Sequence, residues 1–192
     1  MDPAEIRLIE VSRQLATLCA NFMGMYNQAQ ASLALEEVLT PARFASKEGI
    51  ENSKATLASL AQMTLHHRQT FLAFVSQATE KVLTAAAELT PEKRAEVQTS
   101  LVDTINWNLA SNAAFFEGRQ NWTSTAAQLL DLVEANRAVF DFENGIAIGS
   151  DKVLKHFQSL VQTIDEISAR EHALLHEQQA RIATSLAKLS KA

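Results

Sequence analysis

The sequence has few of the residues that interrupt helices or cross-link chains. Its 192 residues include five glycines, three prolines and a single cysteine. Few glycines and prolines, together with abundant Ala, Leu, Glu and Gln, favour helix. The lone Cys19 excludes an intramolecular disulfide, so cysteine usage does not indicate a redox compartment. Apolar residues make up 47% of the chain, which is enough to bury a sizeable core.

A basic stripe and a long apolar run are also missing. The formal charge is −5 with both signs scattered, so we expect neither nucleic acid nor an anionic membrane surface as a partner. No segment reaches the roughly 18 consecutive apolar residues of a membrane span. The N-terminus lacks the basic and apolar regions of a secretory signal. We therefore predict a cytoplasmic chain, although a domain excised from a membrane receptor would have the same composition.

Proline marks the predicted helix starts. Each of the three prolines follows Asp or Thr, residues that can accept hydrogen bonds from the free amides of a first helical turn. Ser150-Asp151 gives a fourth start, directly after a glycine-containing loop. These signals predict four helices, at about 3–38, 41–88, 91–143 and 151–190.

Short connections between long helices predict the topology. Apolar residues recur at heptad-like spacing, as in a coiled coil, and tight turns force neighbouring helices to run antiparallel. We expect one all-α domain, 1–192, folded as an elongated antiparallel up-down-up-down four-helix bundle. In one alternative the third helix is kinked or broken near Gly118, its interior glycine. In another, the second helix starts at Ile50 after a break at Ser46–Gly49.

One stretch of the third predicted helix concentrates bulky and polar side chains. Asn106–Trp122 holds both tryptophans of the chain, two adjacent phenylalanines and Arg119. Counting residues from the turns places Gly118 and Arg119 level with His176 of the fourth helix. Polar residues interrupt the apolar stripes at this height, and a buried charge there should be paired, hydrated or turned outward. These residues are Arg68, Asn108, Asn112, Arg119, Glu171 and His172.

The same layer predicts a ligand site between helices, where pockets of helical bundles form. Its aromatic and polar groups could converge on a small molecule, although aromatic residues at helical spacing more often form plain core. The predicted ligand-binding residues are Trp107, Asn112, Phe116, Arg119, Trp122 and His172.

Histidine spacing gives a weaker signal. His172 and His176 are four residues apart, so both imidazoles lie on one face of a helix, as in helical metal sites. Counting from the turns places only the single Cys19 level with His176, which is too few ligands for a metal site, and the two histidines flank the apolar stripe. We therefore predict neither a metal nor a cofactor, and keep a metalloprotein using this pair as an alternative. No catalytic motif occurs, so we expect no enzyme.

These patterns favour a non-enzymatic binding or interaction module. Its partner would be another protein, a second copy or a small ligand in the middle layer. In architecture and spacing the chain resembles bacterial helical sensory domains, which would imply ligand sensing between helices. In its Ala-, Gln- and Leu-rich composition it is similar to storage-granule phasins. That resemblance implies the alternative of an amphipathic protein that coats an apolar surface.

Overall fold

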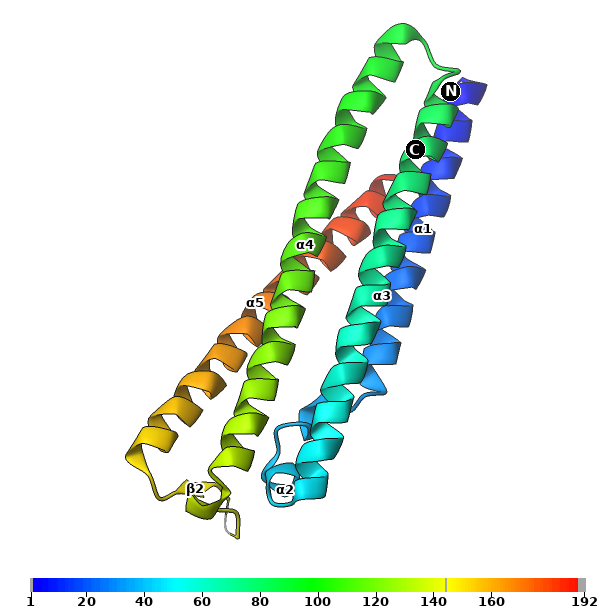
Figure 1. Ribbon diagram of the computed structural model, residues 1–192. Helices are drawn as coiled ribbons and strands as arrows, with labels where there is room; N and C mark the ends of the chain where they lie inside the picture. Colours follow the sequence, from blue (N-terminus) through cyan, green and yellow to red (C-terminus); the bar gives the residue numbers. More distant parts are fainter. Residues whose placement is uncertain (1, 144, 190–192) are drawn as a thin grey trace. The chain divides into compact units, whose positions relative to one another are not determined.

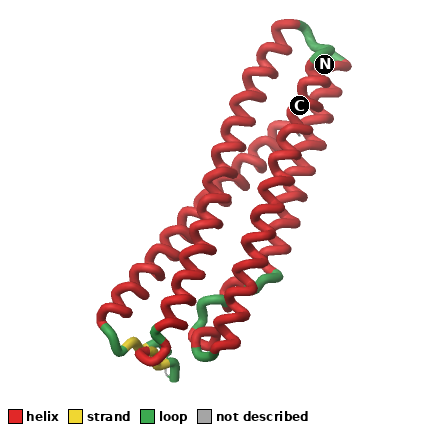
Figure 2. Tube along the Cα trace, in the orientation of Figure 1, coloured by secondary structure: helices red, strands yellow, loops and turns green. Residues whose placement is uncertain are grey.

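The computed structural model describes residues 2–143 and 145–189, without the side chains of Leu186, Lys188 and Leu189. The described chain is all-α, with five α-helices (Figure 1). Short elements occupy the connections, including one two-stranded antiparallel hairpin (Figure 2). In chain order the elements are α1 (Pro3–Ala31), η1 (Leu35–Glu37), α2 (Pro41–Phe44), α3 (Lys47–Ala86), α4 (Pro91–Ala135), η2 (Arg137–Val139), β1 (Phe140–Asp141), β2 (Ala147–Ile148) and α5 (Asp151–Leu189).

Helices begin at all three prolines, as predicted, and the preceding side chains cap them. The Asp2 carboxylate accepts a hydrogen bond from the Ala4 amide at 3.1 Å. The Thr40 hydroxyl accepts one from the Arg43 amide at 3.4 Å. Such caps satisfy amides that the helix itself leaves without acceptors. The predicted start at Asp151 is also observed.

The first predicted helix ends seven residues early, at Ala31 rather than residue 38. The chain then passes through Ala34, whose φ of 47° is left-handed, a conformation that costs a non-glycine residue about 1–2 kcal/mol. Burial explains the departure from helix. Val38 is buried in the core, and the leucines at 33, 35 and 39 pack against that core. A continuous helix would carry part of this apolar segment into solvent.

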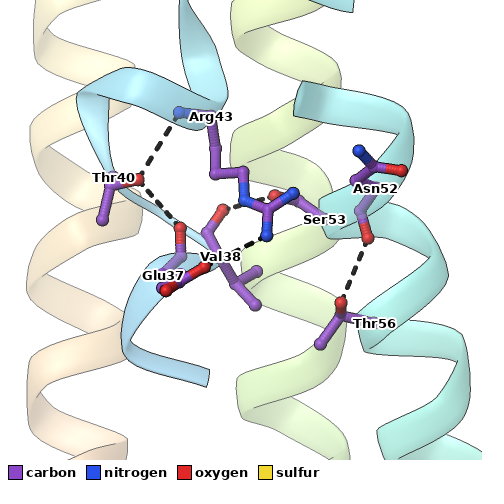
Figure 3. Close-up of polar contacts among 7 residues, drawn as sticks. All are labelled: Glu37, Val38, Thr40, Arg43, Asn52, Ser53 and Thr56. Atoms are coloured by element: carbon purple, nitrogen blue, oxygen red, sulfur yellow. Dashed lines mark hydrogen bonds and ion pairs between the residues drawn. The ribbon is translucent and has the colours of Figure 1, made fainter. Parts of the chain in front are cut away.

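The second predicted helix is divided into α2 and α3 by a break at Ala45–Ser46, close to the alternative that starts it at Ile50. A side chain at Gly49 would overlap the backbone carbonyl of Arg43, so α2 and α3 meet at a distance that only glycine permits. Figure 3 shows how polar contacts hold this connection. Ser53 donates a buried hydrogen bond to the Val38 carbonyl oxygen at 2.8 Å, and Thr40 donates to the Glu37 carbonyl oxygen at 2.9 Å.

The third predicted helix, α4, runs without a break through Gly118 but ends at Ala135 instead of residue 143. The residues beyond it form η2 and the β1–β2 hairpin. Phe140 and Phe142 stack at 5.6 Å between ring centroids, and Phe157 of α5 lies 5.9 Å from Phe140. These aromatic contacts close the core, so the chain leaves the helix where burial of the phenylalanines requires it. Asn144 lies outside the described residues.

The chain forms two compact units, and all four long helices, α1, α3, α4 and α5, contribute to both. Unit 1 consists of residues 1–26, 67–115 and 173–192, and unit 2 of residues 27–66 and 116–172. Unit 2 contains a core centred on the fully buried Leu60, Leu129 and Leu130. In unit 1 a smaller cluster joins Ala4, Ala86 and Leu89.

Candidate functional site

A buried ion pair joins α4 to α5 in unit 2. The Arg119 guanidinium contacts the Glu171 carboxylate, and each side chain is only 7% exposed. Both residues belong to the polar layer recognised in the sequence, and they meet the requirement that a buried charge be paired. Trp122, one helical turn further along α4, is buried in the core cluster of the same unit.

Two polar contacts join α4 to α5 in unit 1. Gln178 donates a hydrogen bond from its side-chain amide to the Ser111 hydroxyl at 3.0 Å, and both residues are buried. The guanidinium carbon of Arg181 lies 4.0 Å from the ring centroid of Trp107, which is cation–π geometry. The two contacts are four residues apart on α4 and three apart on α5, so one antiparallel register accounts for both.

An aromatic stack joins α1 to α3 in unit 1. The His67 ring lies between Phe22, at 4.4 Å between centroids, and Tyr26, at 4.1 Å. Tyr26 also meets Phe115 of α4 edge-on at 5.7 Å. The stack gives His67 a packing role.

The predicted ligand-binding residues divide between the two units. Trp107 and Asn112 belong to unit 1, and the other four, Phe116, Arg119, Trp122 and His172, belong to unit 2. Asn112 donates to the Asn108 carbonyl oxygen one turn back, at 2.9 Å. Phe116 is buried, whereas His172 is exposed. Two members of this set contact side chains outside the predicted site: Arg119 pairs with Glu171, and Trp107 lies against Arg181.

An open groove of about 870 Å³ lies beside Trp107. Most of its lining residues belong to α4, and Arg181 of α5 is the other lining residue. The α4 residues along it are mainly hydroxyls and carboxylates, including Ser100 and Asp103. Trp107 is the predicted ligand residue that lines this groove; the other five do not.

The histidine pair of α5 lies on the surface of the described chain. His172 and His176 are both exposed, which agrees with their predicted flanking position. Within residues 2–143 and 145–189, no three His, Cys, Asp or Glu side chains lie close enough together to hold a metal ion. The pair thus has no third ligand there, and a structural zinc site needs four.

Four groups among the described residues have perturbed pKa values, and in one of them, Lys93, a hydrogen bond to Glu5 raises the pKa. Burial raises the pKa of the half-buried Cys19 thiol. Hydrogen bonds to Asp131 and then Glu134 raise the pKa of Lys54. A hydrogen bond from Lys93 lowers the pKa of Glu5. The shifts of Glu5, Lys54 and Lys93 therefore result from surface ion pairs, and that of Cys19 from burial.

Exposed apolar residues are the feature that sequence reasoning missed. Nine large apolar side chains are exposed in the described chain, and seven of them belong to unit 1. Leu72 and Leu83 of α3 are examples, at 49% and 41% exposure. The unit 1 residues are Ile6, Leu18, Met25, Leu72, Leu83, Val102 and Leu109. Their spacing was visible in the sequence, but spacing alone does not tell an exposed stripe from a buried one.

The two units also differ in formal net charge. Unit 1 has nine Lys and Arg residues against nine Asp and Glu, whereas unit 2 has eight against thirteen. The whole formal charge of −5 therefore belongs to unit 2. Unit 1 thus combines a net charge of zero with exposed apolar side chains, and apolar patches rimmed by polar residues mark interaction sites.

No family profile, no curated protein and no solved structure matches this chain. Over the described residues, no helix has the length and apolar content that a membrane span requires.

Proposed function

We propose that this protein is a non-enzymatic binding module that uses unit 1 as its contact surface and unit 2 as its folded support. The proposal keeps the up-down-up-down arrangement of the four long helices. The observation that carries it is the concentration of exposed apolar side chains on a unit without net charge. Single exposed apolar residues are ordinary, but stripes of them along several helices indicate a surface that is covered in the working state.

The stripes have the period of helix packing. Leu18 and Met25 on α1 are seven residues apart, and so are Val102 and Leu109 on α4. Residues seven apart lie on one face of a helix, which is the spacing by which helices pack against one another. A partner that offers an apolar surface would therefore bury them row by row.

The test compares a unit 1 variant with a unit 2 control. The variant replaces Leu72, Leu83, Val102 and Leu109 by Gln, and the control replaces the exposed Ile146 of unit 2 by Gln. Retention on a phenyl resin and adsorption to a triolein emulsion stabilised by phosphatidylcholine measure apolar binding. We expect the variant to lose both and the control to keep both, with unchanged circular dichroism. Equal binding by variant and wild type would refute the proposal.

A second function, the coating of an apolar surface, draws on the same exposed side chains. Several of them lie on different helices, which an extended surface could contact together. In that case circular dichroism should change when the emulsion is added, because the helices rearrange on the surface. A bundle that binds a discrete partner should keep its spectrum, so one titration separates the two functions.

A small ligand of this protein would bind in the groove beside Trp107. A thermal-shift screen would identify a ligand, and Trp107→Ala should abolish its binding. Arg119→Ala should act on stability, because Arg119 pairs with Glu171. A ligand that binds equally well to the Trp107→Ala protein would refute this location.

A further inference from the structure

We infer that the groove beside Trp107 binds an organic cation, an amine or a guanidine, and prefers one that carries two or more positive groups. This inference rests on the proposed function, because it names the chemical class of the small ligand. Every residue that lines the groove belongs to unit 1. Besides Trp107 and Arg181, the lining supplies three hydroxyls, two carboxylates and one side-chain amide. An apolar ligand would displace water from these groups without replacing its hydrogen bonds.

The Trp107 ring accepts a cation in the structure itself. The guanidinium carbon of Arg181 lies 4.0 Å from the ring centroid. The face of an indole carries partial negative charge, so it attracts ammonium and guanidinium groups, and Trp does so more strongly than Tyr or Phe. Arg181 is exposed, so its side chain can move into solvent and leave the ring to a ligand. The guanidinium of Arg181 therefore occupies the place that a ligand cation would take.

Two carboxylates extend this cation site along α4. Asp103 precedes Trp107 by four residues and Glu96 precedes Asp103 by seven, so all three side chains lie on one face of the helix. Along the helix axis Asp103 is about 6 Å from Trp107 and about 10 Å from Glu96, at 1.5 Å per residue. Among the described lining residues Arg181 is the one base, so the groove has a formal charge of −1, and of −2 once Arg181 has moved out.

Two hydroxyls present acceptors to the groove. Thr99 donates its hydroxyl proton to the Ala95 carbonyl oxygen at 3.1 Å, and Thr104 donates to the Ser100 carbonyl oxygen at 2.8 Å. These protons are used within α4, so the oxygen lone pairs are what the two threonines offer to a ligand. Together with the carboxylates they favour a ligand rich in N–H donors, such as an ammonium group, which has three donors and no acceptor.

These charges and acceptors decide between ligand classes. Asp103 and Glu96 would repel an anion. A neutral sugar would gain hydrogen bonds but no ionic attraction. A cation gains the ring face, the acceptors and a carboxylate, and a second positive group about 10 Å from the first would reach the other carboxylate as well. A linear polyamine such as spermidine therefore fits the groove better than the shorter putrescine.

A nuclear magnetic resonance titration of the full chain tests the inference, because it reports the indole N–H of each tryptophan separately. At about 0.15 M salt, which screens unspecific attraction to the acidic unit 2, spermidine should shift the Trp107 signal. Its Kd should be on the order of 1 mM, since the contacts are exposed. The signal of the buried Trp122 should not move. Putrescine should bind about fivefold more weakly, because it reaches one carboxylate, and glucose and succinate should cause no shift.

Variants separate the parts of the site. Asp103→Asn with Glu96→Gln should weaken spermidine binding about tenfold. Arg181→Ala should tighten it about two- to fivefold, the worth of an exposed cation–π contact, because the internal competitor is gone. A sugar or an anion that used Arg181 as a partner would instead lose affinity. Glu10→Gln with Glu80→Gln removes two exposed carboxylates of unit 1 outside the groove, and this charge-matched control should leave the Kd unchanged.

An oligolysine peptide in the same titration distinguishes the source of the cation. Tighter binding than spermidine would assign the groove to the side chains of a basic peptide, and weaker binding would assign it to a free amine; both results require the cation site. Spermidine binding that survives in the double carboxylate variant, or that weakens in Arg181→Ala, would overturn the inference. So would shifts confined to unit 2, or a groove that takes glucose or succinate and no amine. A chain that binds no amine yet adsorbs to the emulsion would refute the cation site while leaving the proposed function standing.

Discussion

The Arg119–Glu171 pair allows a quantitative prediction about stability. Glu171→Gln removes the negative charge and leaves the guanidinium of Arg119 in a site where its side chain is 7% exposed. Breaking one partner of a buried pair costs about 3–5 kcal/mol, because the remaining charge stays desolvated. We therefore expect the free energy of unfolding to fall by about that amount.

The double variant Arg119→Met with Glu171→Leu gives the complementary result. It removes both charges and supplies apolar groups of similar volume, a change that is often neutral or stabilising by about 1–4 kcal/mol. The non-additivity between the single and double variants would then be large, as expected for contacting residues. The exposed pair Arg170–Glu166 is a matched control, since its loss should cost about 0.5 kcal/mol or less.

Tryptophan fluorescence can follow this unfolding one unit at a time. Each unit contains one of the two tryptophans, Trp107 in unit 1 and Trp122 in unit 2. In a Trp107→Phe background, urea titration reports on unit 2 alone. A Glu171→Gln protein as stable as its parent would refute the reasoning, because it would mean that the pair is solvated in solution.

The remaining predictions concern local features of the helices. Gly118→Ala should stabilise the protein by about 1 kcal/mol, since the added methyl meets no described atom within 4 Å and Ala favours helix. Gly49→Ala should destabilise the protein by about 1–3 kcal/mol, because its side chain overlaps the Arg43 carbonyl. Thermal melts in which the Gly49→Ala protein is the more stable of the two would contradict this. Alkylation of Cys19 at pH 8 should be at least about tenfold slower in the folded protein than in urea, because burial raises its pKa; equal rates by mass spectrometry would show an open unit 1. Because Lys93 lowers the pKa of Glu5 below 4.5, the stability from this pair is present above pH 4.5 and is lost as the pH falls through the folded pKa. Lys93→Gln should flatten that part of the pH–stability curve. An unchanged curve would show that the Lys93–Glu5 pair does not contribute to stability.

Helix starts could be predicted from the sequence, and helix ends could not. Thr40-Pro41 and Thr90-Pro91 act locally, through a cap and a fixed φ, so short sequence segments suffice to locate them. The ends near residues 31 and 135 depend on tertiary burial of Val38 and of Phe140, which the local pattern does not reveal. The all-α class followed from composition and period, whereas the number of helices depended on one close approach at Gly49.

The polar layer was predicted, but its pairing was not. The sequence placed Arg119 level with His176, and the structure pairs it with Glu171, which lies about 7.5 Å nearer the start of α5 at 1.5 Å per residue. The error arises in the connection between α4 and α5, because α4 ends at Ala135 and η2 and the hairpin occupy residues that were predicted to continue the helix to about 143. Exposure of the α3 leucines could not be predicted either, since a heptad stripe looks the same whether a partner helix covers it or solvent does.

Hydrogen exchange on the full chain, with and without the emulsion, tests the central claim most directly. The claim is that unit 1 is the contact surface. It predicts that amides of residues 67–86 and 95–110 gain protection when the emulsion is added, while residues 122–133 of unit 2 do not change. Protection gained in residues 122–133, with none in 67–86 or 95–110, would contradict it.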